Sequence, residues 1–143
     1  MQQNASKTSK QEIIQFLQRE FPQSLIKCEI ESVVDKGATV IYHVDDLDLR
    51  PGGTVSGPTM MTVADYGLYI AILGEIGMVG LSVTTSMNIN FLRKPSGGKD
   101  IRGVCKLMKV GRALIVGEVY LYSVDSDDPI AHVTGTYSIP PKR

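Results

Sequence analysis

The sequence has few of the residues that build metal centres or disulfide frameworks. Two cysteines and two histidines occur among the 143 residues, with no C-x-x-C pair and no cluster of histidines. Metal ligation and a disulfide framework are therefore disfavoured, and Cys28 and Cys105 are interpreted as free thiols in strand-like stretches. His43 and His132 form no recognisable triad with a serine, so we interpret both as structural.

An excess of charge of either sign is also missing. Fifteen basic and fifteen acidic residues balance, which leaves no electrostatic footprint for nucleic acid or an acidic membrane. Residues 1–12 are polar and contain no apolar signal core, and the most apolar run is too short to span a membrane and carries a carboxylate. We therefore expect a cytoplasmic protein whose partner is a small molecule or another copy of itself.

The most apolar stretch, residues 58–74 (PTMMTVADYGLYIAILG), contains one charged residue, Asp65. Pro58 suits the first turn of a helix, and no further proline interrupts the run. Mostly small residues recur on one helical stripe that would lie close against a sheet: Met60, Ala64, Gly67, Ala71 and Gly74. Thr62 and Tyr69 are the polar residues that share a helix face with Asp65.

Ionising an unpaired buried carboxylate is costly, so Asp65 is expected to be hydrogen-bonded, shifted in pKa or facing a wet cleft. Each of these environments is common at reactive sites. The structural alternative is a core aspartate whose oxygens are satisfied by local hydroxyl groups.

The rest of the chain predicts strands on either side of this helix. Ser9 and Glu12 form a capping box that starts a short helix ending before Pro22. A hairpin begins with strand alternation at Ile26 and turns at residues 35–37, and a polar loop follows at residues 45–56. Four strands come after the long helix, at residues 81–92, 101–110, 113–124 and 130–139.

This order of elements implies an α+β architecture of the hotdog type. An antiparallel sheet of about six strands would wrap around one long central helix. Residues 1–143 would form a single domain, with residues 1–22 as an N-terminal extension that carries the short helix. The strand at residues 81–92 alternates between an apolar face (Val83, Met87, Ile89 and Phe91) and a polar one (Ser82, Thr84, Ser86, Asn88 and Asn90). A homodimer that pairs the sheets would remove the exposed sheet edge.

Three motifs resemble the PaaI-like branch of the hotdog acyl-CoA thioesterases. The family signature N-x-x-G-x-x-H-G-G, six further residues and Asp has the spacing of residues 50–58 (RPGGTVSGP) followed by Asp65. Residues 84–93 (TTSMNINFLR) resemble the family strand T-x-x-L-x-I-x-Y-L-R, and residues 109–112 (KVGR) are similar to the hairpin after the fourth strand. The resemblance covers roughly residues 33–139. It implies a thioester hydrolase without a metal or other cofactor, in which coenzyme A is part of the substrate.

The resemblance also implies roles for three residues. The N–H of Gly57, at a helix N-terminus, would polarise the thioester carbonyl. Asp65 would act as nucleophile or as the base that activates water. Thr84 matches a hydroxyl residue that positions water or the carboxylate, although β propensity alone also explains a threonine in a strand.

The signature departs from the family at three positions: Arg50 replaces the asparagine, Ser56 the histidine, and Pro58 the second glycine. Arg50 would either donate to the thioester oxygen or face solvent, and Ser56 suits a helix cap. Arg93, Lys94 and Arg112 are candidates for binding the phosphates of coenzyme A, or else are simply solvated.

The spacing of Gly57 and Asp65 implies a site shared between subunits. Eight residues of helix separate them by about 12 Å along the axis, too far for both to contact one carbonyl within a chain. Activity would therefore require a homodimer or a dimer of dimers. Four methionines are candidates for an apolar lining, with core packing as the alternative: Met60, Met61, Met78 and Met87.

Other functions stay open at this point. A hotdog hydratase or dehydratase needs a histidine paired with an acid near the helix, and Ser56 occupies the position where one would be sought. A non-catalytic acyl-thioester-binding protein would keep Gly57 and bind without turnover. A purely structural dimer would bind no ligand.

Overall fold

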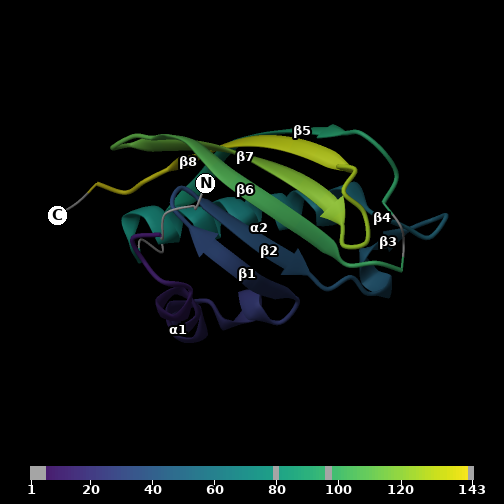
Figure 1. The fold of residues 1–143 in the computed structure, drawn as a ribbon, viewed down its shortest axis with the longest axis horizontal. Helices are drawn as coiled ribbons and strands as arrows, with labels where there is room; N and C mark the ends of the chain where they lie inside the picture. The colour runs from purple at the N-terminus through teal and green to yellow at the C-terminus, as the bar shows by residue number, and fades with distance from the viewer. Residues whose placement is uncertain (1–5, 79–80, 96–97, 142–143) are drawn as a thin grey trace.

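One antiparallel sheet curves around a long helix, α2 (Gly57–Ile76), as Figure 1 shows. The computed structural model describes residues 6–78, 81–95 and 98–141. The sheet order is β1-β2-β6-β7-β8-β5. The strands are β1 (Cys28–Val34), β2 (Gly37–Tyr42), β5 (Val83–Phe91), β6 (Ile101–Val110), β7 (Leu114–Ser123) and β8 (Ala131–Ser138). The predicted hotdog arrangement is confirmed.

The small-residue stripe of α2 lies against the sheet, as predicted. All five residues of the stripe are buried. A Cβ added to Gly67 would lie 3.7 Å from Cβ of Cys105 and from Cγ2 of Val40, which is ordinary van der Waals contact. Small residues therefore bring the helix axis close to the central strands. The helix begins one residue before the predicted run and ends at Ile76, followed by the C-cap Gly77, whose φ of 95° favours glycine.

The short helix α1 (Lys10–Glu20) has the predicted capping box, with Ser9 and Glu12 as its members. The prediction that the first strand begins at Ile26 is wrong. A 3-10 helix, η1 (Pro22–Leu25), follows α1, and Ile26 at its end is 78% exposed. Residues in this tight turn cannot extend into a strand, so β1 begins at Cys28.

The predicted loop at residues 45–56 contains local structure of its own. A 3-10 turn, η2 (Asp46–Asp48), precedes a two-stranded hairpin of β3 (Leu49–Arg50) and β4 (Thr54–Val55). Gly52 and Gly53 have φ values of 98° and 78°, which glycine adopts without strain. The loop therefore has a defined path to the start of α2.

Strand β5 is an edge of the sheet and pairs only with β8 within the described residues. A β-bulge lies between Thr84 and Ser86, so plain alternation fails there. Thr84 consequently faces α2 on the same side as Met87, whereas Val83 is 56% exposed. The predicted assignment of Val83 to the face of Met87 is wrong for this reason.

The helix and the inner face of the sheet enclose the hydrophobic core. Cys105 is buried in it and Cys28 is half-buried, both as free thiols. Burial raises the pKa of both thiols, that of Cys28 to about 11. Across the described ranges, no helix combines the length and apolarity that crossing a membrane would require.

Candidate functional site

The carboxylate of Asp65 is held by two hydroxyl groups from the sheet. Thr84 Oγ1 on β5 donates to Asp65 Oδ1 at 2.5 Å, and the Tyr137 hydroxyl on β8 donates to the same oxygen at 2.6 Å. Thr84 and Tyr137 are direct cross-strand partners, because the β5 bulge sets this register. The Tyr137 hydroxyl also lies 3.2 Å from the backbone oxygen of Asp65.

This arrangement makes the two carboxylate oxygens of Asp65 unequal. Both hydroxyl donors contact Oδ1, and no donor among the described residues contacts Oδ2. The side chain is half-buried. Oδ2 is therefore the oxygen that is available to a water molecule or a substrate carbon.

Tyr137 was not among the residues predicted from the sequence. The predicted helix neighbours of Asp65 do not bind it: the Thr62 hydroxyl bonds to the Pro58 carbonyl, and the Tyr69 ring packs 6.5 Å from the ring of Tyr137. Burial, together with the hydrogen bond to Asp65, raises the pKa of Tyr137. The phenol therefore stays protonated and remains a donor at neutral and alkaline pH.

Gly57 occupies the first turn of α2, where backbone N–H groups lack intrahelical acceptors. Ser56 caps this end, as expected, by accepting a hydrogen bond from the Thr59 N–H at 3.3 Å. A Cβ on Gly57 would lie 3.2 Å from Cζ of Phe91. A larger residue here would therefore crowd the Phe91 ring unless the ring moved aside.

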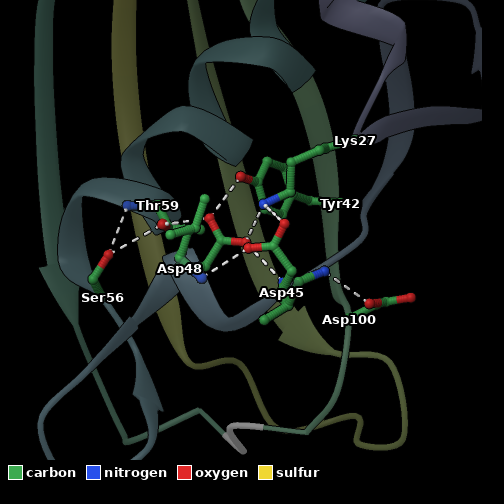
Figure 2. Close-up of polar contacts among 9 residues, drawn as sticks. Lys27, Tyr42, Asp45, Asp48, Ser56, Thr59 and Asp100 are labelled. Atoms are coloured by element: carbon green, nitrogen blue, oxygen red, sulfur yellow. Dashed lines mark hydrogen bonds and ion pairs between the residues drawn. The ribbon is translucent and has the colours of Figure 1, made fainter.

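A polar network anchors the start of α2, as Figure 2 shows. Its centre is Asp48, which is 5% exposed. Asp48 Oδ1 accepts hydrogen bonds from the hydroxyls of Tyr42 at 2.7 Å and Thr59 at 3.1 Å. Asp48 Oδ2 accepts from the Asp45 N–H and is ion-paired with Lys27. The sequence analysis did not identify this network.

The charges of the network are strongly stabilised. Burial alone would raise the pKa of Asp48, but hydrogen bonds, from Lys27 first, lower it to about 2. For Lys27, burial would lower the pKa, and the carboxylates of Asp48 and Asp45 raise it instead. Both groups stay ionised at neutral pH, so the ion pair persists and holds Ser56 and Gly57 in a fixed position.

A cleft of about 440 Å³ lies at this end of α2. Gly57, Met60 and Phe91 line it together with three of the predicted basic residues, Arg50, Arg93 and Lys94. Arg93 Nε donates to the Pro129 carbonyl at 2.9 Å. The cleft therefore combines a helix N-terminus with basic side chains, which suits an anionic ligand.

The remaining predicted residues lie elsewhere. Arg112 does not join the other basic residues, because it lines a separate cavity beside Glu75, near the C-terminal end of α2. Pro58 is exposed in the first turn. Met78 lines the cavity beside Glu75, Met61 is 40% exposed and Met87 packs on the core. Within one chain, Gly57 and Asp65 belong to different turns of α2.

Neither histidine forms a site with the helix. His43 is exposed between Asp100 and Glu29, and His132 Nε2 lies 3.0 Å from Glu118. In the part of the chain that the structure describes, no three His, Cys, Asp or Glu residues are arranged to hold a metal ion.

Comparisons with known proteins place this geometry in a family. No curated protein matches the chain in sequence. The family model of the thioesterase superfamily matches residues 52–130, more than half of the chain, and this stretch contains Gly57, Asp65 and Thr84. The chain belongs to the thioesterase superfamily.

Solved structures agree with the assignment of the chain to the thioesterase superfamily. A candidate thioesterase of Silicibacter sp. TM1040 is 38% identical, with a TM-score of 0.87 over 98% of this chain and 97% of that one. The PaaI protein of E. coli, from the phenylacetic acid degradation operon, has a TM-score of 0.77 at 17% identity over 91% of each chain. A hypothetical thioesterase protein of Streptococcus pneumoniae TIGR4, solved with coenzyme A, has a TM-score of 0.71 at 20% identity over 83% of this chain and 93% of that one. The chain has the hotdog fold of this superfamily, and the E. coli PaaI protein shares that fold.

Proposed function

We propose that the protein hydrolyses an acyl-CoA to a carboxylic acid and coenzyme A. The oxygen of water bonds to the carbonyl carbon and the carbon–sulfur bond breaks. The sulfur of coenzyme A leaves as a thiol with one proton from the water. Asp65 supplies the reactive carboxylate and the Gly57 N–H binds the oxyanion. No metal or redox cofactor takes part in this scheme, and coenzyme A is present only as part of the substrate.

The asymmetry of Asp65 carries the proposal. Thr84 and Tyr137 both donate to Oδ1 and hold the carboxylate, while Oδ2 has no donor among the described residues. The side chain is half-buried, so Oδ2 is left to water or to a bound molecule. An oriented carboxylate with one unbound oxygen suits a base for water or a nucleophile toward the acyl carbon.

A second copy of the chain completes the proposed site. Within one chain the carboxylate and the helix N-terminus are separated by about 12 Å of helix axis. Strand β5, which carries Thr84, lies at the edge of the described sheet, and through this edge a second copy would bring its Gly57 to Asp65.

The cleft beside Gly57 supports coenzyme A as the leaving group. Arg50, Arg93 and Lys94 line it and would bind phosphates, with the guanidinium groups able to do so in a bidentate manner. The coenzyme A in the Streptococcus pneumoniae structure adds support from a protein of the same fold. Arg112 would join this group only from the other subunit.

The test is release of free thiol from aromatic, short-chain and long-chain acyl-CoAs. Asp65→Asn is nearly isosteric and should lower kcat by about a hundredfold or more, the loss expected for an acid-base or nucleophilic group. Asp127→Asn, an exposed carboxylate, is the matched control and should keep wild-type rates. Equal rates for wild type and Asp65→Asn would contradict the proposal. Binding of acyl-CoA without turnover of any substrate would favour the non-catalytic binding protein.

A further inference from the structure

The first turn of α2 offers a ligand one backbone donor. Pro58 has no N–H, and the Thr59 N–H donates to the Ser56 hydroxyl at 3.3 Å. The Met60 N–H donates to the Ser56 carbonyl at 3.2 Å, and the Ser56 hydroxyl donates to Thr59 Oγ1 at 3.1 Å. Among the described residues no acceptor contacts the Gly57 N–H. An oxyanion at this turn would therefore depend on a single hydrogen bond, so the surroundings of that bond matter.

The ring of Phe91 lies beside this donor. A Cβ built on Gly57 would lie 3.2 Å from Cζ and 3.6 Å from Cε1 of Phe91, so the tip of the ring faces the Cα of Gly57. Phe91 is 53% exposed and lines the cleft of about 440 Å³ together with Gly57 and Met60. On this side, the residue that carries the free N–H is therefore in contact with an apolar group and not with water.

Hydrogen bonds hold both sides of this contact in place. Phe91 is the last residue of β5, where it is paired with Ala131 on β8. The next N–H, that of Leu92, donates to the Ile130 carbonyl at 2.8 Å. On the other side, the Asp48 carbonyl accepts from the N–H of the residue before Gly57 at 2.8 Å. The ring and the donor therefore keep their relative position.

Resting on the function proposed above, we propose that Phe91 is a positioning residue for thioester hydrolysis, because its ring covers one side of Gly57 and excludes water from the oxyanion donor. A hydrogen bond to a developing negative charge is stronger where water does not compete for it. The charge on the carbonyl oxygen appears only during the reaction. The ring should therefore act on kcat and leave KM almost unchanged.

Two substitutions of similar apolarity test whether the reach of the side chain matters. An extended methionine reaches about as far as the ring tip of phenylalanine, whereas leucine ends well short of it. Phe91→Leu should lower kcat about tenfold with KM within about twofold, and Phe91→Met should keep kcat within about threefold of wild type. The measurement is thiol release from the acyl-CoA that wild type hydrolyses fastest. Wild-type kcat in Phe91→Leu, or equal losses in both variants, would overturn the inference.

Tyr120→Leu is the matched control. Tyr120 on β7 is also a partly exposed aromatic residue, at 38%, and it does not line the cleft. This variant should keep the kcat of wild type. A tenfold loss in Tyr120→Leu would show that removing any exposed ring slows the enzyme, and would overturn the inference.

Binding of a thioether separates this role from substrate binding. S-hexyl-coenzyme A has no carbonyl and cannot be hydrolysed, so it develops no charge at Gly57. Calorimetric titration into the full chain should give a Kd for Phe91→Leu within about twofold of wild type. A rise in Kd that matches the loss of rate would show that Phe91 binds the substrate, and would overturn the inference.

A double variant tests the contact itself. Gly57→Ala alone crowds the Phe91 ring, but the atoms that it crowds, Cζ and Cε1, are absent in Phe91→Leu. The variant with both changes should therefore be faster than Gly57→Ala alone. Two losses that simply multiply would show that the residues act independently, and would overturn the inference.

Failure of this inference and failure of the proposed function give different results. Hydrolysis that is slowed by Asp65→Asn and unaffected by Phe91→Leu would overturn the inference alone. Absence of acyl-CoA hydrolysis by wild type would overturn the proposed function, and the inference with it.

Discussion

The hydroxyl of Tyr137 fixes the Asp65 carboxylate to the sheet. Tyr137 is 3% exposed, and its O–H and that of Thr84 both donate to Asp65 Oδ1. Thr84 is exposed in the single chain, so the buried tyrosine is the more rigid of the two donors. Because its pKa is raised, Tyr137 stays a neutral donor to the Asp65 carboxylate.

Tyr137→Phe should therefore slow the reaction without weakening substrate binding. The ring stays in place while one of the two donors to Oδ1 is lost, so we expect kcat to fall about tenfold with KM nearly unchanged. Tyr69→Phe is the matched control, since its ring packs beside Tyr137 and, within the described residues, its hydroxyl makes no hydrogen bond to Asp65. Steady-state kinetics of both variants decide the matter, and equal losses of kcat would contradict a specific role for Tyr137.

At the scale of elements, one buried carboxylate attaches the irregular segment before α2 to the rest of the fold. Asp48 binds Lys27 before β1, Tyr42 at the end of β2 and Thr59 in the first turn of α2. Its backbone oxygen also accepts a hydrogen bond from the Ser56 N–H at 2.8 Å. The position of Gly57 therefore depends on contacts made by a residue nine positions earlier.

Asp48→Asn should destabilise the protein and change its response to acid. Replacing one acceptor oxygen by an NH₂ group breaks the ion pair and at least one hydrogen bond, so we expect a loss of about 2 kcal/mol in the free energy of unfolding at neutral pH. The folded pKa of Asp48 is lowered from 3.8 to about 2. Its contribution to stability is therefore complete above about pH 4 and is lost as the pH falls toward 2.

Denaturant unfolding between pH 7 and pH 2 measures both effects. Wild type should lose more stability than Asp48→Asn over the acidic part of this range, because the variant lacks the titrating group. Asp46→Asn, an exposed neighbour in the same turn, should behave like wild type. The interpretation would be wrong if the two variants had the same stability at pH 7.

The sequence predicts a helix or strand well where one hydrophobic periodicity dominates the segment. The helix of residues 58–74 and the capping box of Ser9 were visible because both depend on residues within a few positions of one another. The β5 bulge was not, because it depends on pairing with β8, more than forty residues later. The partnership of Asp65 with Tyr137 follows from that pairing, so the same long-range register hid it.

At the scale of the whole molecule, the residues of the site lie at separate places on one chain. Gly57 and the basic cleft are at one end of α2, Asp65 is in its middle, and Arg112 lies in the cavity with Glu75 at the other end. Sequence spacing alone indicates that Gly57 and Asp65 are too far apart to share a carbonyl. Sequence spacing does not show that Arg112 and Arg50 lie far apart, because only the fold places the loops that carry them at different ends of α2.

Two inactive variants should restore each other if the site is shared. Gly57→Ala brings a Cβ to 3.2 Å from the Phe91 ring and should displace the carbonyl enough to lower activity about a hundredfold. When it is co-expressed with Asp65→Asn, each mixed dimer has one site with both changes and one with neither. Random pairing should then recover about a quarter of wild-type activity.

Differently tagged chains allow the mixed species to be purified and assayed directly. Co-expression of Asp65→Asn with a second, differently tagged Asp65→Asn chain is the control and should recover nothing. Mixed Gly57→Ala and Asp65→Asn dimers that stay as inactive as either parent would show that each site is built within one chain.

Because β5 lies at the edge of the sheet, a site shared across that edge would make the catalytic rate per subunit depend on the protein concentration. Thr84 donates to Asp65 from a strand whose outer side has no pairing partner among the residues that the structure describes. If a second copy supplies both that pairing and the Gly57 N–H, diluting the enzyme separates the reacting groups. Specific activity would then fall with dilution, and the concentration of the chain would itself set the turnover per subunit.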